Sequence, residues 1–507
     1  MRTLKAFFNS SFALLYRLVL LFSGFFVSRL LLENYGSSIN GMVSSIKQFV
    51  SYLSLFEAGI AGASIYALYK PLAENNDKEI SQILSDAKRY YKRSGIAVSI
   101  ACIGLAIFYV SFAGSKEIDK LTMFLVFLIL SVNTALDFFA FAKYRVIFTA
   151  DQREYVISIC NIIHTIVYCI LTYVAVRLDA NIVLMQLTVI GAFLVRSIFL
   201  YLFYRSIYAD RFDFNITTTE HKVPQKTAVL FHEICFLVLS SSPMIIMTIS
   251  KVSFKMISVY SVYNLISSNI VTLIAIFNSS LTAGFGELIS KKLFLKFNKA
   301  FHEFELFYYI LASFVFVCTL LLIQSFVNVY TSGITDISYN NKLLYTLLIL
   351  LGMCNCLRVP PSILISITGS FNATIKSTIF IIIFTLAISW GLSFVGFEYI
   401  LIGSIIGYIL RSCSYIYKAS QLNINYDIKK TIKNLFISGL AFIISFILCS
   451  LFLEYTATTY LMWIKEAIIT VIICALVFYI LIFILSKNEL FSLINRFKNL
   501  LFMKKAG

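Results

Sequence analysis

Residues 191–206 read GAFLVRSIFLYLFYRS, and residues 406–420 read IGYILRSCSYIYKAS. Each stretch has an aliphatic residue before Arg-Ser, then an aromatic-rich tail, and then a basic residue close to a serine. The arginines of the two stretches are Arg196 and Arg411. A weaker match joins IFTADQREY to SITGSFNATIK at a nearly equal offset along the chain. The pattern predicts an internal repeat, which is common in transporters that bind substrate between their repeats.

The composition places most of the chain in lipid. Of its 507 residues, 59% are hydrophobic and 13% are charged, and the mean hydropathy is +0.87. Soluble domains are about one quarter charged. A soluble protein could not bury this much apolar surface, so the bilayer must be the main solvent. We therefore expect an all-α polytopic membrane protein.

Fourteen segments are long and apolar enough to serve as membrane spans, because a span needs about 20 largely apolar residues. The segments are residues 12–32, 40–68, 94–114, 121–142, 156–176, 183–204, 229–250, 257–283, 305–330, 343–369, 377–395, 397–417, 434–453 and 467–485. The chain has only five prolines, so we expect most of these helices to be continuous.

The repeat and the spans together predict two six-helix lobes followed by two additional helices. The predicted parts are an N-terminal lobe (1–205), a cytoplasmic linker (206–228), a C-terminal lobe (229–420), the two additional helices (431–486) and a basic cytoplasmic tail (487–507). All external connections between spans are short, so we expect no separate soluble domain.

The net charge of +17 follows the positive-inside rule. If the N-terminus is cytoplasmic, 29 of the 42 lysines and arginines lie on the cytoplasmic side, 7 lie on the opposite side and 6 lie within spans. This asymmetry predicts that both termini are cytoplasmic. It also explains the basic charge without nucleic acid as a partner.

Three stretches resemble a known family. They are LFEAGIAGASIYALYKPLA (55–73), VIFTADQREYVIS (146–158) and GSIIGYILRSCSYIY (403–417). With the fourteen spans and the repeat, they resemble the bacterial polysaccharide flippases, which export lipid-linked oligosaccharides. That family belongs to the multidrug/oligosaccharidyl-lipid/polysaccharide (MOP) superfamily.

The resemblance implies a V-shaped pair of lobes around a cavity in the bacterial plasma membrane. It implies that alternating access moves an oligosaccharide linked to undecaprenyl pyrophosphate to the outer leaflet. The two additional helices would then form a groove for the lipid tail. A polysaccharide polymerase is a candidate partner, and the two lobes make an oligomer unnecessary.

Charged residues inside the predicted spans are the candidate functional residues, because a charge at bilayer depth is costly and usually faces a partner or a wet cavity. The candidates selected are Arg17, Arg29, Lys47, Arg196, Arg358 and Arg411, which are basic, and Glu57 and Asp137, which are acidic. The basic excess suits a pyrophosphate, and an arginine can grip phosphate oxygens with two parallel hydrogen bonds. The six basic residues are therefore expected to line a cationic substrate cavity.

Several of these residues have a second interpretation. Arg29 can instead pair with Glu33, one turn along its helix. Glu57 belongs either to a coupling-ion site or to a structural ion pair with Arg17. Asp137 is a candidate proton or sodium site, and it can instead cap a polar cluster with Asn133.

The arginines of the repeat also allow two interpretations. Arg196 and Arg411 either form a symmetric pair of phosphate contacts or extend to the membrane interface. Arg358 precedes Pro360 and Pro361, where the helix must kink or break. A break near the middle of a span favours a role for Arg358 in substrate binding or gating.

No cofactor or metal site is expected. The ten cysteines lie in apolar runs and are interpreted as packing residues. The four histidines, including His164 in the predicted span 156–176, are not expected to form a site.

The leading functional hypothesis is a lipid-linked oligosaccharide flippase. A drug/cation antiporter of the same superfamily would share its architecture, but a cationic substrate should favour acidic rather than basic cavity residues. A membrane enzyme of polysaccharide synthesis would need acid and base groups near the reacting bond, and no such pair is visible. The nucleotide-binding motif G-x-x-x-x-G-K-[ST] does not occur in the sequence. The glycan, the energy source and the surface polymer remain open.

Overall fold

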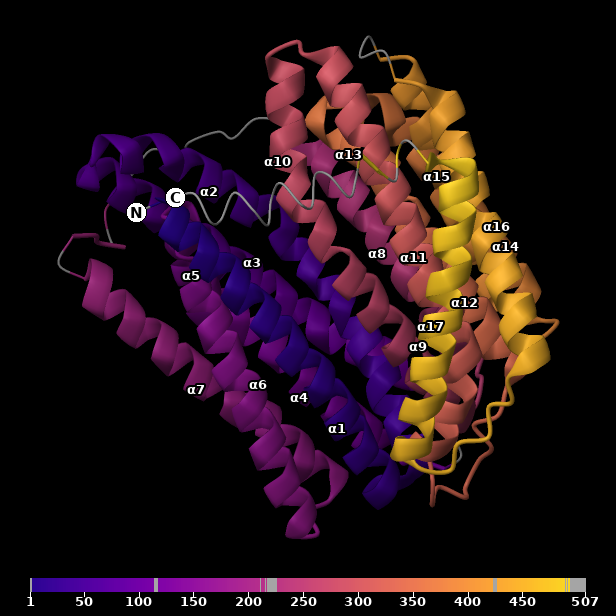
Figure 1. The fold of residues 1–507 in the computed structure, drawn as a ribbon. Helices are drawn as coiled ribbons and strands as arrows, with labels where there is room; N and C mark the ends of the chain where they lie inside the picture. Colours follow the sequence, from indigo (N-terminus) through magenta and orange to yellow (C-terminus); the bar gives the residue numbers. More distant parts are fainter. Residues whose placement is uncertain are drawn as a thin grey trace. The chain divides into compact units, whose positions relative to one another are not determined.

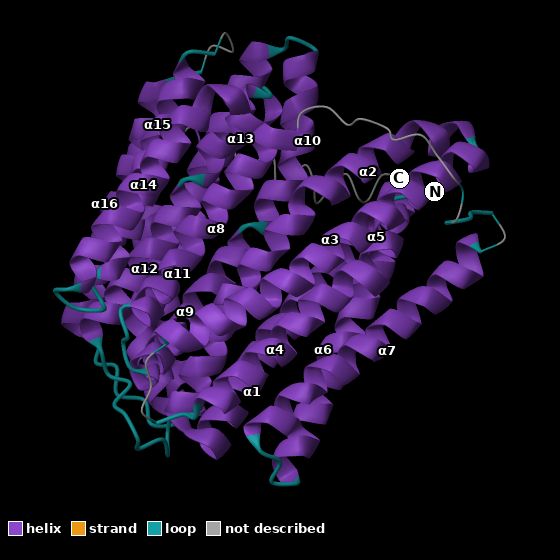
Figure 2. Cartoon of the chain, turned by 180° about the vertical axis from the view of Figure 1, so that it is seen from behind, coloured by secondary structure: helices purple, strands orange, loops and turns teal. Residues whose placement is uncertain are grey.

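The computed structural model describes residues 2–113, 117–209, 211–214, 216, 226–422, 426–487, 489 and 491–492. Every regular element within these residues is a helix (Figure 2). Twelve of the described helices are long and apolar enough to cross a membrane, and Ile234–Ile249 is a shorter apolar helix. The prediction of an all-α polytopic membrane protein is confirmed.

The chain divides into two compact units, one of residues 1–261 with 334–337 and one of residues 262–333 with 338–507. The first unit holds α1 (Arg2–Ser51), η1 (Tyr52–Ser54), α2 (Leu55–Glu74), α3 (Asp77–Phe112), α4 (Lys120–Leu136), η2 (Asp137–Phe141), α5 (Ala142–Ala150), α6 (Glu154–Arg177), α7 (Ile182–Tyr208) and α8 (Lys226–Ile249). In this unit α6 packs along α1 and α7, and α3 packs on α2 and α4 (Figure 1).

The first helix contains a reversal of direction. Near its start, Lys5 Nζ lies 2.9 Å from Asp151 Oδ1 in the α5–α6 turn. Near its middle, the Tyr35 hydroxyl donates to the Ala180 carbonyl (2.7 Å) in the α6–α7 turn, at the opposite end of α6. The next residue, Gly36, leaves the helical region (φ 79°, ψ 172°), and the chain turns back there.

The returning segment ends near the start of α1. It runs through η1 and α2 to Glu74, and α3 begins at Asp77, which pairs with Arg211 beyond α7 (2.8 Å). The Tyr208 hydroxyl, at the end of α7, donates to Asp151 (2.5 Å). Residues 2–35 and 37–74 are therefore two passages. With this second passage and Ile234–Ile249, the twelve apolar helices account for the fourteen predicted spans.

Several predicted spans contain breaks. The predicted span 40–68 is interrupted at η1, where the Ser51 hydroxyl donates back to the Gln48 carbonyl (2.6 Å), an interaction that bends helices. The span 121–142 contains a π-helical turn, η2, which begins at Asp137. The break at Arg358 was predicted from the prolines and is confirmed, since one helix ends at Leu357 and the next begins at Val359.

The second unit is built around one long buried helix. Its helices are α9 (Phe254–Ile274, divided between the units), α10 (Ile276–Ser290), α11 (Phe294–Tyr330), α12 (Lys342–Leu357), α13 (Val359–Ile367), η3 (Ser370–Thr374), α14 (Ile375–Ser393), α15 (Ile400–Ser420), α16 (Ile428–Phe452) and α17 (Tyr460–Leu485). α11 packs against α12, α16 and α17 (Figure 1). The last two helices, α16 and α17, also pack against each other, and their assignment as a pair additional to two lobes stays a prediction.

The helix α8 packs within the first unit. The Gln48 amide donates to the Ser241 hydroxyl (2.5 Å), and the hydroxyls of Ser45 and Thr248 lie 2.7 Å apart. The predicted lobe limits, 1–205 and 229–420, stay predictions. Most of the predicted linker 206–228 and tail 487–507 lies outside the described residues.

Candidate functional site

A pocket of about 280 Å³ lies within the first unit. It is lined by Lys47, Val50 and Ser51 from α1, Leu130, Asn133 and Thr134 from α4, His164 and Tyr168 from α6, and Val189 from α7. Four helices therefore contribute to the pocket, and most of its polar groups come from three of them.

Lys47 provides the positive charge of this pocket. The Lys47 side chain is exposed, and it lies on the second passage of the chain (residues 37–74), after the reversal at Gly36. Among the described residues no ion pair to Lys47 is present. Its ammonium group can therefore meet an anion in the pocket as a point charge.

Three further side chains offer polar atoms to a ligand. The Asn133 Oδ1, His164 Nε2 and Tyr168 hydroxyl are buried, and no hydrogen-bond partner for them is found in the described part of the chain. His164 and Tyr168 lie four residues apart on α6, so they share one helix face. Buried polar atoms normally have partners. These three atoms thus point to a polar ligand or to water in the pocket.

An ion pair lies one helical turn beyond the pocket. Asp137, four residues after Asn133, accepts a hydrogen bond from Arg196 Nη2 on α7. Arg196 Nη1 also lies 3.4 Å from the Asn161 side-chain oxygen, and Asn161 precedes His164 by one turn on α6. The guanidinium carbon of Arg196 is 4.1 Å from the centre of the Phe141 ring. The carboxylate, the amide and the ring hold Arg196 in one orientation.

The pairing of Asp137 with Arg196 was not predicted from the sequence. Each residue was identified as a candidate by itself, and the proposed polar partner of Asp137 was Asn133. The Arg196 side chain is 12% exposed, so the alternative in which it extends to the membrane interface is wrong. The physical reason is the Asp137 carboxylate at the start of η2, which pairs with the guanidinium inside the bundle.

The remaining candidates of the first unit lie elsewhere on α1 and α2. Arg29 Nη2 is 2.6 Å from Glu33 Oε1, so the alternative pairing allowed by their spacing is the one observed. Arg17 is half-buried on the first passage of α1. The side chain of Glu57 lies outside the described residues, so its pairing with Arg17 stays a prediction.

The two candidates of the second unit, Arg358 and Arg411, lie close to Tyr408. Arg358, at the break between α12 and α13, donates to Asn355 (3.3 Å), and its guanidinium carbon lies 5.9 Å from the centre of the Tyr408 ring. Arg411 follows Tyr408 by one turn on α15 and is 2% exposed. Its Nε donates to the Tyr415 hydroxyl (2.8 Å). The interface alternative is therefore wrong for Arg411 as well.

The repeat-related arginines have different partners. Arg196 contacts a carboxylate, whereas Arg411 contacts a tyrosine hydroxyl. The pocket around Lys47 also depends on His164, which sequence reasoning set aside because a lone histidine in a span carries little signal. Its spacing from Asn161 and Tyr168 on one face of α6 was the only available indication.

Within the described residues, no group of three or more His, Cys, Asp and Glu side chains is placed to hold a metal ion. The ten cysteines are free thiols, of which Cys449 and Cys474 have sulfurs 3.8 Å apart. The first-unit pocket offers a ligand the charge of Lys47 and several hydrogen-bonding groups.

The fold is that of MOP-superfamily transporters. An inward-facing multidrug-resistance MATE family transporter of the MOP superfamily superposes with a TM-score of 0.66 at 13% identity, covering 80% of this chain and 94% of the transporter. The lipid II flippase MurJ, in an inward closed conformation, superposes with a TM-score of 0.62 at 15% identity, covering 95% of this chain and 99% of the flippase.

A third structure is a MOP-superfamily transporter from Pyrococcus furiosus, described by the reverse polarity of its binding pocket. Its TM-score is 0.52 at 14% identity, over 82% of this chain and 93% of that protein. No family model and no curated protein matches the chain. The structural comparisons show a fold shared with these transporters, and they do not extend to a family or to a substrate.

Proposed function

We propose that this chain is a flippase for polyprenyl-pyrophosphate-linked oligosaccharides in the bacterial plasma membrane. It would translocate a repeat unit by alternating access, for the synthesis of a surface polysaccharide such as O-antigen, capsule or exopolysaccharide. Membrane lipid and the undecaprenyl pyrophosphate-linked substrate are the proposed partners, with a polysaccharide polymerase acting on the product.

The observation that carries this proposal is the extent of the match to the lipid II flippase. That match covers 95% of the chain, whereas the match to the MATE transporter covers 80%. The helices α16 and α17 have 25 and 26 residues, which together exceed the part of the chain that the flippase match leaves out. The match therefore includes part of these two helices. The near-complete match to a protein named for a lipid-linked substrate supports a substrate of that kind here.

The distribution of charge supports an anionic substrate. Of the charged residues selected as candidates within the predicted spans, six are basic and two are acidic, and one of the acidic pair, Asp137, contacts Arg196. Lys47 would bind a phosphate from the first-unit pocket, with His164 and Tyr168 contributing hydrogen bonds. Arg358 and Arg411 would recognise phosphate from the second unit. Asp137 and Glu57 stay candidates for ion coupling.

A drug/cation antiporter is the second candidate. The inward-facing MATE transporter has the higher TM-score, 0.66 against 0.62 for the flippase. A cationic drug would be repelled by Lys47 at close range. The two candidates therefore differ in the sign of the cargo that the pocket should accept.

Deletion of the gene tests the proposal in cells. Complete lipid-linked repeat units should accumulate on the cytoplasmic leaflet, and surface polymer should be absent. A membrane-impermeant glycosidase is added to inverted and to right-side-out vesicles. It cleaves only the lipid-linked units on the outer face of each vesicle, so the extent of cleavage shows which leaflet holds them. Truncated units would mean that a chemical step is missing. Normal polymer together with increased drug sensitivity would favour the antiporter.

A further inference from the structure

A second pocket, of about 460 Å³, lies within the second unit between α11 and α16. We infer that this α11–α16 pocket binds the phosphodiester group of an anionic phospholipid. Five side chains carry the inference: Lys299 and His302 from α11, and Lys430, Lys433 and Asn434 from α16. The inference rests on this unit alone and is independent of the transported substrate.

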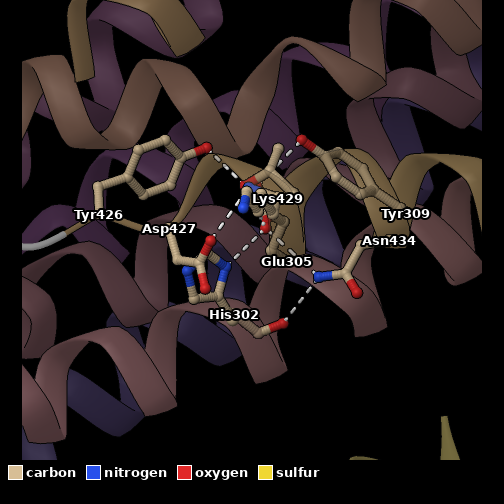
Figure 3. A network of polar contacts seen from close by, with 8 residues as sticks. His302, Glu305, Tyr309, Tyr426, Asp427, Lys429 and Asn434 are labelled. Atoms are coloured by element: carbon tan, nitrogen blue, oxygen red, sulfur yellow. Dashed lines mark hydrogen bonds and ion pairs between the residues drawn. The ribbon is translucent and has the colours of Figure 1, made fainter. Parts of the chain in front are cut away.

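A buried polar network orients the floor of the pocket (Figure 3). Its centre is Glu305, which is fully buried. Each carboxylate oxygen of Glu305 lies 2.9 Å from the Thr431 hydroxyl. His302 Nδ1 lies 3.0 Å from Glu305 Oε2, and the His302 ring stacks on Tyr426 with centroids 5.6 Å apart. The carboxylate and the aromatic ring thus fix the imidazole.

The other ring nitrogen of His302 points to a ligand. His302 is 6% exposed and lines the pocket, and its Nε2 has no hydrogen-bond partner among the residues that the structure covers. Glu305 lies at Nδ1, so Nε2 is the ring nitrogen left for a ligand. An Nε2–H group would donate to an oxygen of a bound phosphate. Asn434, 5% exposed, is held beside it by its contact with the His302 carbonyl (3.3 Å).

The charges of the walls select a ligand with a single negative charge. Three lysines, Lys299, Lys430 and Lys433, line the pocket. Two carboxylates oppose them: Glu489 lies 3.4 Å from Lys433, and Glu303 accepts from the Ser492 hydroxyl (2.7 Å). The balance of these five side chains is positive by one charge. A phosphodiester carries one negative charge and matches this balance better than a dianionic phosphate does.

The surroundings of the pocket indicate a lipid rather than a soluble phosphate. Leu295, which lines the pocket, is 84% exposed, and Ile432 and Phe436 on α16 are 58% and 65% exposed. These apolar side chains belong to helices long and apolar enough to cross the membrane. The lysines of α16 lie in its first two turns, just before the predicted span 434–453. Basic pockets between transmembrane helices on the cytoplasmic side bind anionic headgroups.

Native mass spectrometry of the purified full-length chain tests the inference. The protein is titrated with phosphatidylglycerol or with phosphatidylcholine, and bound lipid is counted. The wild type should retain phosphatidylglycerol preferentially. The double variant K430Q/K433Q should bind it about 25-fold more weakly, at about fivefold per lysine. H302Q should also weaken binding. K429Q is the matched control, since Lys429 is adjacent in sequence but does not line the pocket.

The outcomes separate the sources of the ligand. Retention in the wild type and in K429Q, with loss in K430Q/K433Q, supports the inference. Equal loss in K429Q would mean general surface attraction and would overturn it. Displacement of the lipid by millimolar inorganic phosphate would assign the pocket to a soluble anion instead. If H302Q fails to fold, the lysine variants still test the inference, because they change only lysine side chains in the first two turns of α16.

Discussion

At the scale of single residues, the charges inside the bundle are arranged in two ways. Asp137 and Arg196 neutralise each other between α4 and α7, while Lys47 faces a pocket with buried polar atoms around it. The first arrangement favours stability and orientation. The second favours recognition of an anion, and the two can be separated by mutation.

The Asp137–Arg196 pair should behave as a coupled unit. Asp137→Asn and Arg196→Gln should each lower the melting temperature of the purified protein, because each leaves a partly buried charge without its counter-charge. The double variant should recover part of the loss, with a coupling energy of about 1–3 kcal/mol. Additive losses would show that the two side chains act separately.

Lys47→Ala should reduce export of lipid-linked oligosaccharide while leaving the amount of protein in the membrane unchanged. A reduction of about tenfold or more is expected, since a hydrogen bond to a charged group contributes about 1.5–3 kcal/mol. Lys70→Ala is the control, because Lys70 is on a neighbouring helix and is 80% exposed. Surface polymer at the wild-type level in Lys47→Ala would remove Lys47 from the site.

The sequence was sufficient to identify the charged residues of the spans but not to pair them. The Arg29–Glu33 ion pair could be predicted because both residues lie on one helix, four residues apart. The Asp137–Arg196 ion pair could not be predicted, because that requires knowing that α4 and η2 pack on α7. The contribution of His164 was missed for the same reason, since it depends on three other helices.

At the scale of helices, two features control the path of the chain. The reversal in α1 depends on Gly36, and the Asp336 carboxylate accepts from the backbone N–H and the hydroxyl of Ser37, both at 2.8 Å. A carboxylate at the start of a helical segment satisfies its free N–H groups. The second feature is the Glu305 network, which joins α11 to α16.

Gly36→Ala should lower the stability of the protein. The backbone of Gly36 has φ 79° and ψ 172°, a region that is essentially restricted to glycine and costs other residues about 1–3 kcal/mol. Gly104→Ala is the matched control, because Gly104 lies within α3 with nothing within 4 Å of an added Cβ. Thermal unfolding in detergent should show a lower midpoint for Gly36→Ala alone. Equal midpoints would mean that the turn tolerates a side chain.

Thr431→Val should loosen the attachment of α16 to α11. It keeps the shape of the side chain but removes the hydroxyl that lies 2.9 Å from both oxygens of buried Glu305. The expected loss is about 1–3 kcal/mol, because a buried carboxylate loses one of its hydrogen-bond donors. Thr431→Ser keeps the hydroxyl and should stay closer to the wild type in the same unfolding assay. If Thr431→Val were as stable as Thr431→Ser, other donors would be sufficient to satisfy Glu305.

Helix breaks were harder to predict than helices. Pro360 and Pro361 marked the break at Arg358, because a proline inside a helix removes a backbone hydrogen bond and kinks or breaks the helix. The break at η1 and the π-helical turn at Asp137 have no proline. They depend on side-chain hydrogen bonds and on packing, which a hydropathy pattern does not encode.

At the scale of the whole molecule, hydropathy and loop charge were sufficient to predict an all-α membrane protein with about fourteen passages. The repeat predicts two six-helix lobes, whose limits stay predictions, and the chain divides into two compact units with the division within α9. The MOP fold itself was anticipated through resemblance rather than through composition. Substrate identity depends on side chains of the pocket that have no sequence signature of their own.

The most direct measurement is translocation by the purified full-length chain in liposomes. The cargo is the lipid-linked oligosaccharide that accumulates in the deletion strain, fluorescently labelled and read with a membrane-impermeant quencher. The account predicts exchange between leaflets that is faster than in protein-free liposomes and is strongly reduced by Lys47→Ala. The account would be contradicted if the lipid-linked oligosaccharide exchanged between leaflets only at the protein-free rate while the same liposomes transported a cationic dye.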